Sequence, residues 1–181
     1  MIQNETICAA ATPAGGAITV IRVSGDNAIK IADKIFRGKA KLSETRPNSI
    51  RYGEIVDADG TIVDDVLISV FKSPNSYTGE NSIEISCHGS MYITKSIIKL
   101  LVDNGCKLAR PGEFTQRAFL NGKMDLSQAE AVADLIAAST KASHDIAISQ
   151  LKGNFSNELA TLREQLLNLT SLLELELDFS D

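Results

Sequence analysis

The stretch from Lys107 to Ile136 reads KLARPGEFTQRAFLNGKMDLSQAEAVADLI, and it marks a change of architecture. It opens with turn residues over 110–114, and Asn121-Gly122 forms a second turn signal. Asp125 then starts a helical pattern, and Gln128 follows three residues later, which is the spacing of a capping box. We therefore expect the boundary between a mixed domain and a helical domain to lie within this stretch.

Upstream of this boundary, strand and helix patterns alternate along the chain. The run 17–23 is rich in β-branched residues, and Asp59-Gly60 is a hairpin signal between two apolar runs. Such an intermixed order predicts an α+β domain with a mixed sheet over residues 1–118. The expected elements are strands over 6–10, 17–23, 50–56, 61–71, 82–87 and 106–109, and helices over 27–37 and 91–103.

Downstream of the boundary, the pattern is helical throughout. One helix is expected over 125–152, ending at Gly153, and a second continues toward Asp178. Along the second helix, leucines recur at alternating spacings of 4 and 3 and form one apolar stripe. Leu167, Leu172 and Leu175 lie outside it and form a second stripe. Because one antiparallel helix cannot cover both stripes, we expect further chain or a partner to cover the second. Residues 119–181 are thus predicted to be the first helices of an incomplete helical domain.

The composition of the 181-residue chain indicates a cytoplasmic protein. Hydrophobic residues make up 44% of it, yet no run approaches the roughly 18 apolar residues of a membrane span. Residues 1–5 lack the basic and apolar regions of a secretory signal. Three widely spaced cysteines argue against a disulfide framework or a metal site, so they are expected to be small buried hydrophobes: Cys8, Cys87 and Cys106.

Charge is distributed unevenly between the two predicted parts. Residues 125–181 hold ten acidic and three basic side chains, a balance of −7, within a net charge of −5. The first 124 residues hold 13 acidic and 15 basic side chains, a balance of +2. Neither part is a basic nucleic-acid surface, so most phosphate contacts to an RNA are not expected here.

The motifs that usually carry catalysis are absent from the sequence. No G-x-x-x-x-G-K-[ST] phosphate loop occurs, and Gly15-Gly16 precedes a strand, so we interpret it as a turn. Cys87 and His88 are neighbours on a strand and should point to opposite faces, which argues against a Cys–His pair. His144 lies mid-helix and is expected at the surface. We predict no catalytic residue in this chain.

Three charged residues each have a structural and a functional interpretation. Arg22 is the last but one residue of an apolar strand, where it could form a structural ion pair or bind a carboxylate or carbonyl of a ligand. Glu84 alternates with two isoleucines, so it faces solvent or accepts from a ligand edge with several N–H donors. Lys123 precedes a helix cap and is either solvated or bound to an anion. A structural ion-pair network is expected among three further residues: Arg110, Glu113 and Arg117.

Four sequence blocks resemble the tRNA-modification GTPase family MnmE, also called TrmE. The first is the opening stretch; the second is TICAAATPAGGAITVIRVSG from Thr6 to Gly25. The third is PNSYTGENSIEISCHG from Pro74 to Gly89, and the fourth is LDFSD at 177–181. Two features depart from the family pattern: the glycine turn is shorter than in some members, and Ser90 stands where a glycine is frequent. These departures put the loop geometry near a ligand in doubt.

The resemblance implies a folate-binding, dimerising domain over 1–118, followed by helices at 119–181. In this family the domain binds a formylated tetrahydrofolate, taken here as 5-formyl-tetrahydrofolate, close to the homodimer interface. The matching positions for ligand contact are Arg22, Glu84 and Lys123. The complete protein would hydrolyse GTP with Mg²⁺ and K⁺ and, with the FAD-dependent partner MnmG, modify C5 of the wobble uridine of tRNA. The GTPase domain and the C-terminal C-x-G-K ending of the family are not in this sequence.

Two other interpretations remain open at this point. The chain could be a free-standing folate-dependent one-carbon transferase, since aminomethyltransferases share the implied architecture. It could also be a purely structural dimerisation module whose ligand site is unused. Turnover of a formyl-folate would distinguish the first alternative, and loss of tRNA modification on changing Arg22 or Glu84 would argue against the second.

Overall fold

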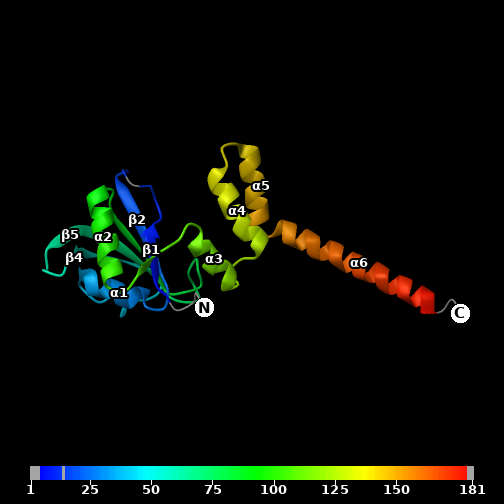
Figure 1. Cartoon of the computed structure of the whole chain (residues 1–181), viewed down its shortest axis with the longest axis horizontal. Helices are drawn as coiled ribbons and strands as arrows, with labels where there is room; N and C mark the ends of the chain where they lie inside the picture. Colours follow the sequence, from blue (N-terminus) through cyan, green and yellow to red (C-terminus); the bar gives the residue numbers. More distant parts are fainter. Residues whose placement is uncertain (1–4, 14, 179–181) are drawn as a thin grey trace. The chain divides into compact units, whose positions relative to one another are not determined.

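The structure is a computed structural model that describes residues 5–13 and 15–178 (Figure 1). Ala14 of the glycine turn and residues 179–181 of the last sequence block lie outside the described residues. Contacts divide the chain into two compact units, Met1–Lys123 and Met124–Asp181. The division falls after the position 118 that the sequence suggested, because the helix containing Arg117 packs onto the first unit through buried contacts.

A mixed sheet forms the centre of the first unit. Its strand order is β3-β4-β5-β6-β2-β1-β7, with antiparallel pairing except between β1 and β7. The predicted α+β class is therefore confirmed. The strands within the described residues are β1 (Ile7–Ala10), β2 (Ile18–Ser24), β3 (Phe36–Gly38), β4 (Ser49–Val56), β5 (Ile62–Phe71), β6 (Ser82–His88) and β7 (Lys107–Leu108).

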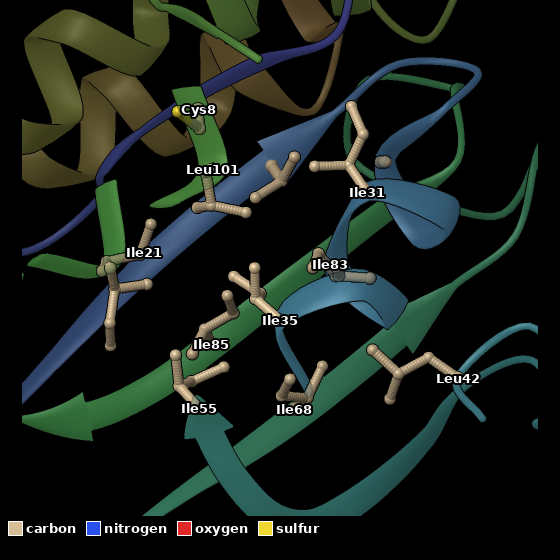
Figure 2. Close-up of a cluster of buried hydrophobic side chains, with 14 of the residues drawn as sticks. Cys8, Ile21, Ile31, Ile35, Leu42, Ile55, Ile68, Ile83, Ile85 and Leu101 are labelled. Atoms are coloured by element: carbon tan, nitrogen blue, oxygen red, sulfur yellow. The ribbon is translucent and has the colours of Figure 1, made fainter. Parts of the chain in front are cut away.

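Two helices, α1 (Ala28–Ile35) and α2 (Met91–Asp103), cover one face of this sheet (Figure 1). The strand residues facing them are almost entirely β-branched, and Ile21, Ile68 and Ile85 have no exposed surface. Figure 2 shows these side chains gathered with Ile35 of α1 in one cluster. All three cysteines are buried and unpaired, as predicted. The helix-covered face thus holds the core of the first unit.

The opposite face of the sheet carries polar and exposed apolar side chains. Because strand residues alternate between faces, Arg22 and Glu84 lie on this side, between buried neighbours. The predicted alternation along β6 is confirmed. Large apolar side chains are exposed on the same face at Ile18, Tyr52 and Leu67, and Tyr52 is directly opposite Leu67 on the neighbouring strand. We call this side the open face.

The predicted hairpin is present and has the expected turn chemistry. Between β4 and β5, Asp57 Oδ1 accepts the N–H groups of Asp59 at 3.0 Å and Thr61 at 2.8 Å. Gly60 adopts a φ of 82°, a left-handed conformation that glycine takes without strain. The local Asp-Gly signal therefore identified the turn correctly.

Three predicted elements of the chain were wrong in detail. The first helix ends at Ile35, and Phe36–Gly38 instead forms β3, because these residues pair with β4 at the sheet edge. The stretch expected to be a turn at 110–114 leads into a missed helix, α3 (Glu113–Leu120). The single helix expected over 125–152 is two helices, α4 (Leu126–Ala137) and α5 (Lys141–Leu151).

The second unit consists of α4, α5 and the longer α6 (Asn154–Asp178). The capping box predicted at Asp125 and Gln128 is confirmed. A second box, between Thr140 and Ser143, starts α5 and explains the break in the expected helix. Buried Ala131 and Ala147 allow α4 and α5 to approach closely. By contrast, the described side chains of α6 include eight exposed leucines: Leu159, Leu162, Leu166, Leu167, Leu169, Leu172, Leu173 and Leu175.

Candidate functional site

Arg22 and Glu84 meet on the open face as a cross-strand pair. They are register partners between β2 and β6. Nε of Arg22 donates to Oε1 of Glu84 at 2.9 Å, and Nη2 lies 2.8 Å from the same oxygen in an ion pair. Among the described residues, no hydrogen bond joins Oε2 of Glu84 or Nη1 of Arg22 to another group. One carboxylate oxygen and one guanidinium nitrogen of the pair are therefore available to a ligand.

Two aromatic rings hold the Arg22 guanidinium. Its Cζ lies 5.0 Å from the centre of the Tyr77 ring and 5.6 Å from that of Phe114. Both distances suit cation–π contacts, which are worth on the order of 1 kcal/mol at partly exposed sites. The Tyr77 hydroxyl is also 2.9 Å from the hydroxyl of Thr115 on α3. The rings fix the guanidinium plane while about a quarter of the Arg22 side chain stays exposed.

Lys123 is anchored to the same loop that supplies Tyr77. Its Nζ donates to the carbonyl oxygen of Pro74 at 3.0 Å. Its stem packs on Gly79, where an added Cβ would lie 3.3 Å from Lys123 Cγ. Residues 72–81 thus contact Arg22 through Tyr77 and Lys123 through Pro74 and Gly79. This loop therefore contacts two of the three residues chosen from the sequence, and the third, Glu84, pairs with Arg22.

A buried charge network fixes α3 against that loop. Nη1 of Arg117 donates to Glu80 Oε1 at 3.1 Å and to the carbonyl oxygen of Glu5 at 2.8 Å, and Nη2 donates to Glu113 Oε1 at 3.1 Å. Arg110 also pairs with Glu113. The predicted network of Arg110, Glu113 and Arg117 is confirmed, and Glu80 joins it. Since Phe114 follows Glu113, the network positions one wall of the Arg22 site.

Glu113 owes its ionisation to this network. Burial alone would raise the pKa of its carboxyl, but the N–H of Arg110 and the guanidinium of Arg117 outweigh burial and hold the pKa below its ordinary value. Glu113 is therefore a carboxylate wherever the first unit is folded near neutral pH. The charged form is required for both of its arginine contacts.

Sequence reasoning missed a histidine–aspartate pair at the end of β6. Asp64 is largely buried. Its Oδ2 accepts the backbone N–H of His88 at 2.8 Å, and its Oδ1 lies 2.7 Å from Nδ1 of the same histidine. Cys87 points the opposite way and is buried, as the strand alternation predicted. Desolvation and the nearby Asp64 raise the pKa of the Cys87 thiol to about 11. The thiol is therefore mostly protonated near neutral pH, and its burial on the face opposite His88 argues against a Cys87–His88 pair.

Metal and membrane sites find no support in the described part of the chain. Within it, no three His, Cys, Asp or Glu side chains cluster in a way that could hold a metal ion. The helices there include none that is long and apolar enough to cross a bilayer. His144 is exposed on α5, as expected.

Known families match nearly the whole of this chain. Residues 6–123 match the model described as GTP-binding protein TrmE N-terminus, and residues 126–181 match the MnmE helical domain. The chain belongs to the TrmE/MnmE family. The two matches meet where the structure divides into its two units. The family resemblance stated from four sequence blocks is thereby confirmed.

Several relatives share more than half of their aligned residues with this chain. A tRNA modification GTPase MnmE of Bacteroides fragilis is 57% identical over 183 residues, covering 99% of this chain and 39% of the relative. One of Flavobacterium psychrophilum is 57% identical over 185 residues, covering 100% and 40%. One of Porphyromonas gingivalis is 54% identical over 183 residues, covering 99% and 38%. The chain thus spans about two fifths of the length of these relatives.

Proposed function

We propose that this chain is the folate-binding and dimerising portion of a GTPase that modifies C5 of the wobble uridine of tRNA. Family membership and the printed name of the relatives, tRNA modification GTPase, support the activity of the complete protein. GTP, Mg²⁺ and K⁺ would be bound outside this sequence, which has no phosphate-loop motif. The complete protein would act in the cytoplasm with the FAD-dependent MnmG, and this portion would not itself be catalytic.

The open geometry of the Arg22–Glu84 pair carries the folate-binding part of the proposal. A pterin presents adjacent N–H donors, and a carboxylate oxygen with no protein partner, Oε2 of Glu84, can accept from such an edge. The free Nη1 of Arg22 can donate to a ring or formyl carbonyl. Lys123, held by the same loop, suits the carboxylates of the glutamate tail. These residues fit 5-formyl-tetrahydrofolate.

The exposed apolar side chains of the open face support dimerisation. Leu67 and Tyr52 are neighbours across β5 and β4, and Ile18 is exposed on β2. A patch of this kind commonly marks an interface with another protein surface. A second copy placed over the open face would also enclose the Arg22–Glu84 pair, which would exclude water from the bound ligand. We therefore place the homodimer interface on this face.

Calorimetric titration with 5-formyl-tetrahydrofolate tests the ligand assignment. The unchanged chain should bind saturably, and Arg22→Ala or Lys123→Ala should weaken binding at least about tenfold without a change in the far-ultraviolet circular dichroism. A folded protein that binds no folate would support the purely structural module. Turnover of the folate by this chain alone would support the free-standing one-carbon transferase.

A further inference from the structure

A basic segment stands out against the acidic character of the chain. Residues 30–51 contain seven basic and two acidic side chains, a balance of +5 in a chain whose net charge is −5. The segment runs through α1, β3, the connecting loop and the first residues of β4. The first 124 residues have a balance of only +2, so their total charge did not indicate this local excess. The basic residues are all exposed: Lys30, Lys34, Arg37, Lys39, Lys41, Arg46 and Arg51.

Specific contacts fix the loop that displays these charges. Both oxygens of Asp33 accept loop N–H groups, from Leu42 at 2.5 Å and from Ser43 at 3.0 Å. Leu42 is fully buried, so the loop is pinned to the core beside α1. The same contacts occupy Asp33, the acid on α1 that could otherwise pair with the surrounding lysines. The loop therefore has a fixed conformation, and its basic side chains are exposed to solvent.

Arg51 on β4 and one further cation, Lys72 just after β5, contact this loop. Nε of Arg51 donates to Thr45 Oγ1 at 3.3 Å, and Nζ of Lys72 donates to the carbonyl oxygen of Ser43 at 3.4 Å. We define the basic loop surface as Arg37, Lys39, Lys41, Arg46, Arg51 and Lys72. Of these six, only Arg37 takes part in a salt bridge among the described residues, with Glu54. Most of its positive charge is therefore not neutralised within the described chain.

The basic loop surface includes a concave region. A cavity of about 650 Å³ lies against β3 and β4, and Arg37, Lys39 and Arg51 contribute to its lining. Gly38 and Gly53, which also line the cavity, lie against the Phe36 ring, and a Cβ on Gly38 would lie 2.6 Å from that ring. The lining also includes Glu54, whose carboxylate pairs with Arg37, so Lys39 and Arg51 are the lining cations without a salt bridge among the described residues. These two cations can contact a backbone phosphate group.

We propose that the basic loop surface binds the phosphate backbone of RNA. The loop between residues 37 and 49 exposes no large hydrophobic side chain, while Ile50 and Tyr52, on either side of Arg51, are exposed in the cavity lining. Unpaired lysines and arginines supply the counterion-releasing contacts of nucleic-acid binding. The relatives are named tRNA modification GTPases, so we choose RNA as the polyanion that this surface binds. The surface shares no residue with the proposed folate site, so the two proposals can fail separately.

The test measures binding of an unmodified tRNA transcript to this chain by fluorescence anisotropy between 50 and 200 mM salt, about the range where such contacts dominate. The variant Lys41→Glu/Arg46→Glu should raise the Kd at least about tenfold. It should also reduce the slope of log K against log salt by roughly 1.4–1.8, since each phosphate contact contributes about 0.7–0.9. Both positions are exposed, so folding should be unaffected.

The matched control is Lys95→Glu/Lys99→Glu, which makes the same charge change at two exposed positions of α2. It should change the Kd less than about threefold. Binding of 5-formyl-tetrahydrofolate should be unchanged in both variants, which separates this result from the folate proposal. Equal losses in both variants, no saturable RNA binding, or an unaffected Lys41→Glu/Arg46→Glu variant would each overturn the assignment.

Discussion

The two units of this chain bury their apolar side chains to very different extents. In the first unit, Ile21, Ile85 and Leu101 are fully buried between the sheet and two helices. In the second, the buried hydrophobics within the described residues are Ala131 and Ala147, while the leucines of α6 remain about half exposed. The first unit therefore has a core of its own, whereas the leucines of α6 are not covered by other described residues. This difference predicts that stability and ligand binding belong to the first unit.

The largest effect is expected from Arg117→Ala in the first unit. Removing the guanidinium leaves the buried Glu80 and Glu113 without their shared partner, which costs about 3–5 kcal/mol in the free energy of unfolding. Chemical denaturation followed by circular dichroism measures it. The control is Arg163→Ala on α6, an exposed arginine whose loss should change that free energy by less than about 0.5 kcal/mol. Similar losses in both variants would contradict the difference between the units.

A matched pair of leucine truncations measures the same contrast in apolar packing. Leu101→Ala removes a fully buried side chain of α2 and should cost about 2–5 kcal/mol of unfolding free energy. Leu169→Ala removes a side chain that is 56% exposed on α6, so the change should stay below about 1 kcal/mol. If Leu169→Ala proved as costly as Leu101→Ala, the α6 leucines would already be covered in solution, through self-association for example.

Replacing Thr140 by Ala should have a smaller effect, confined to the second unit. The Thr140 side chain accepts the N–H of Ser143 at 3.2 Å and caps α5. Losing an N-cap costs about 0.5–2 kcal/mol. We expect reduced helical circular dichroism and faster hydrogen exchange at the start of α5, with the first unit unchanged. If instead the helical signal rose, the break between α4 and α5 would not be a preferred structure.

The acid sensitivity of the first unit should depend on Glu113. Its pKa is lower in the folded state than in the unfolded chain, so its stabilising contribution is fully present above the ordinary value of 4.5. The contribution is lost as the pH falls from there through the folded-state pKa. Unfolding measured between pH 6 and about 3 should show a shallower decline for Glu113→Gln than for the unchanged chain. Parallel pH curves would exclude Glu113 as a contributor.

Features with a local cause could be predicted from the sequence. The hairpin follows from Asp59-Gly60, the capping box from Asp125 and Gln128, and the faces of β6 from strict alternation around Glu84. In each case the deciding contacts lie within a few residues along the chain.

Features that depend on distant contacts could not be predicted. The eight residues of α3 follow a turn signal, and Arg117 secures the helix through Glu80 and the carbonyl of Glu5. The aromatic rings around Arg22 come from two distant segments. The break before Lys141 has no glycine or proline to mark it, and Ser143 stands where the capping-box pattern has Glu or Gln, so the sequence signal for a new helix is weak.

The most direct test of the proposed function compares two cross-strand Arg–Glu pairs of the same sheet. Arg22–Glu84 carries the proposed ligand contact, and Arg37–Glu54, with an Nη2–Oε2 distance of 2.7 Å, is its control at the sheet edge. Calorimetric titration with 5-formyl-tetrahydrofolate should show affinity reduced at least about tenfold by Glu84→Gln and unchanged by Glu54→Gln. Equal affinities in both variants would contradict the proposal that Glu84 binds the folate.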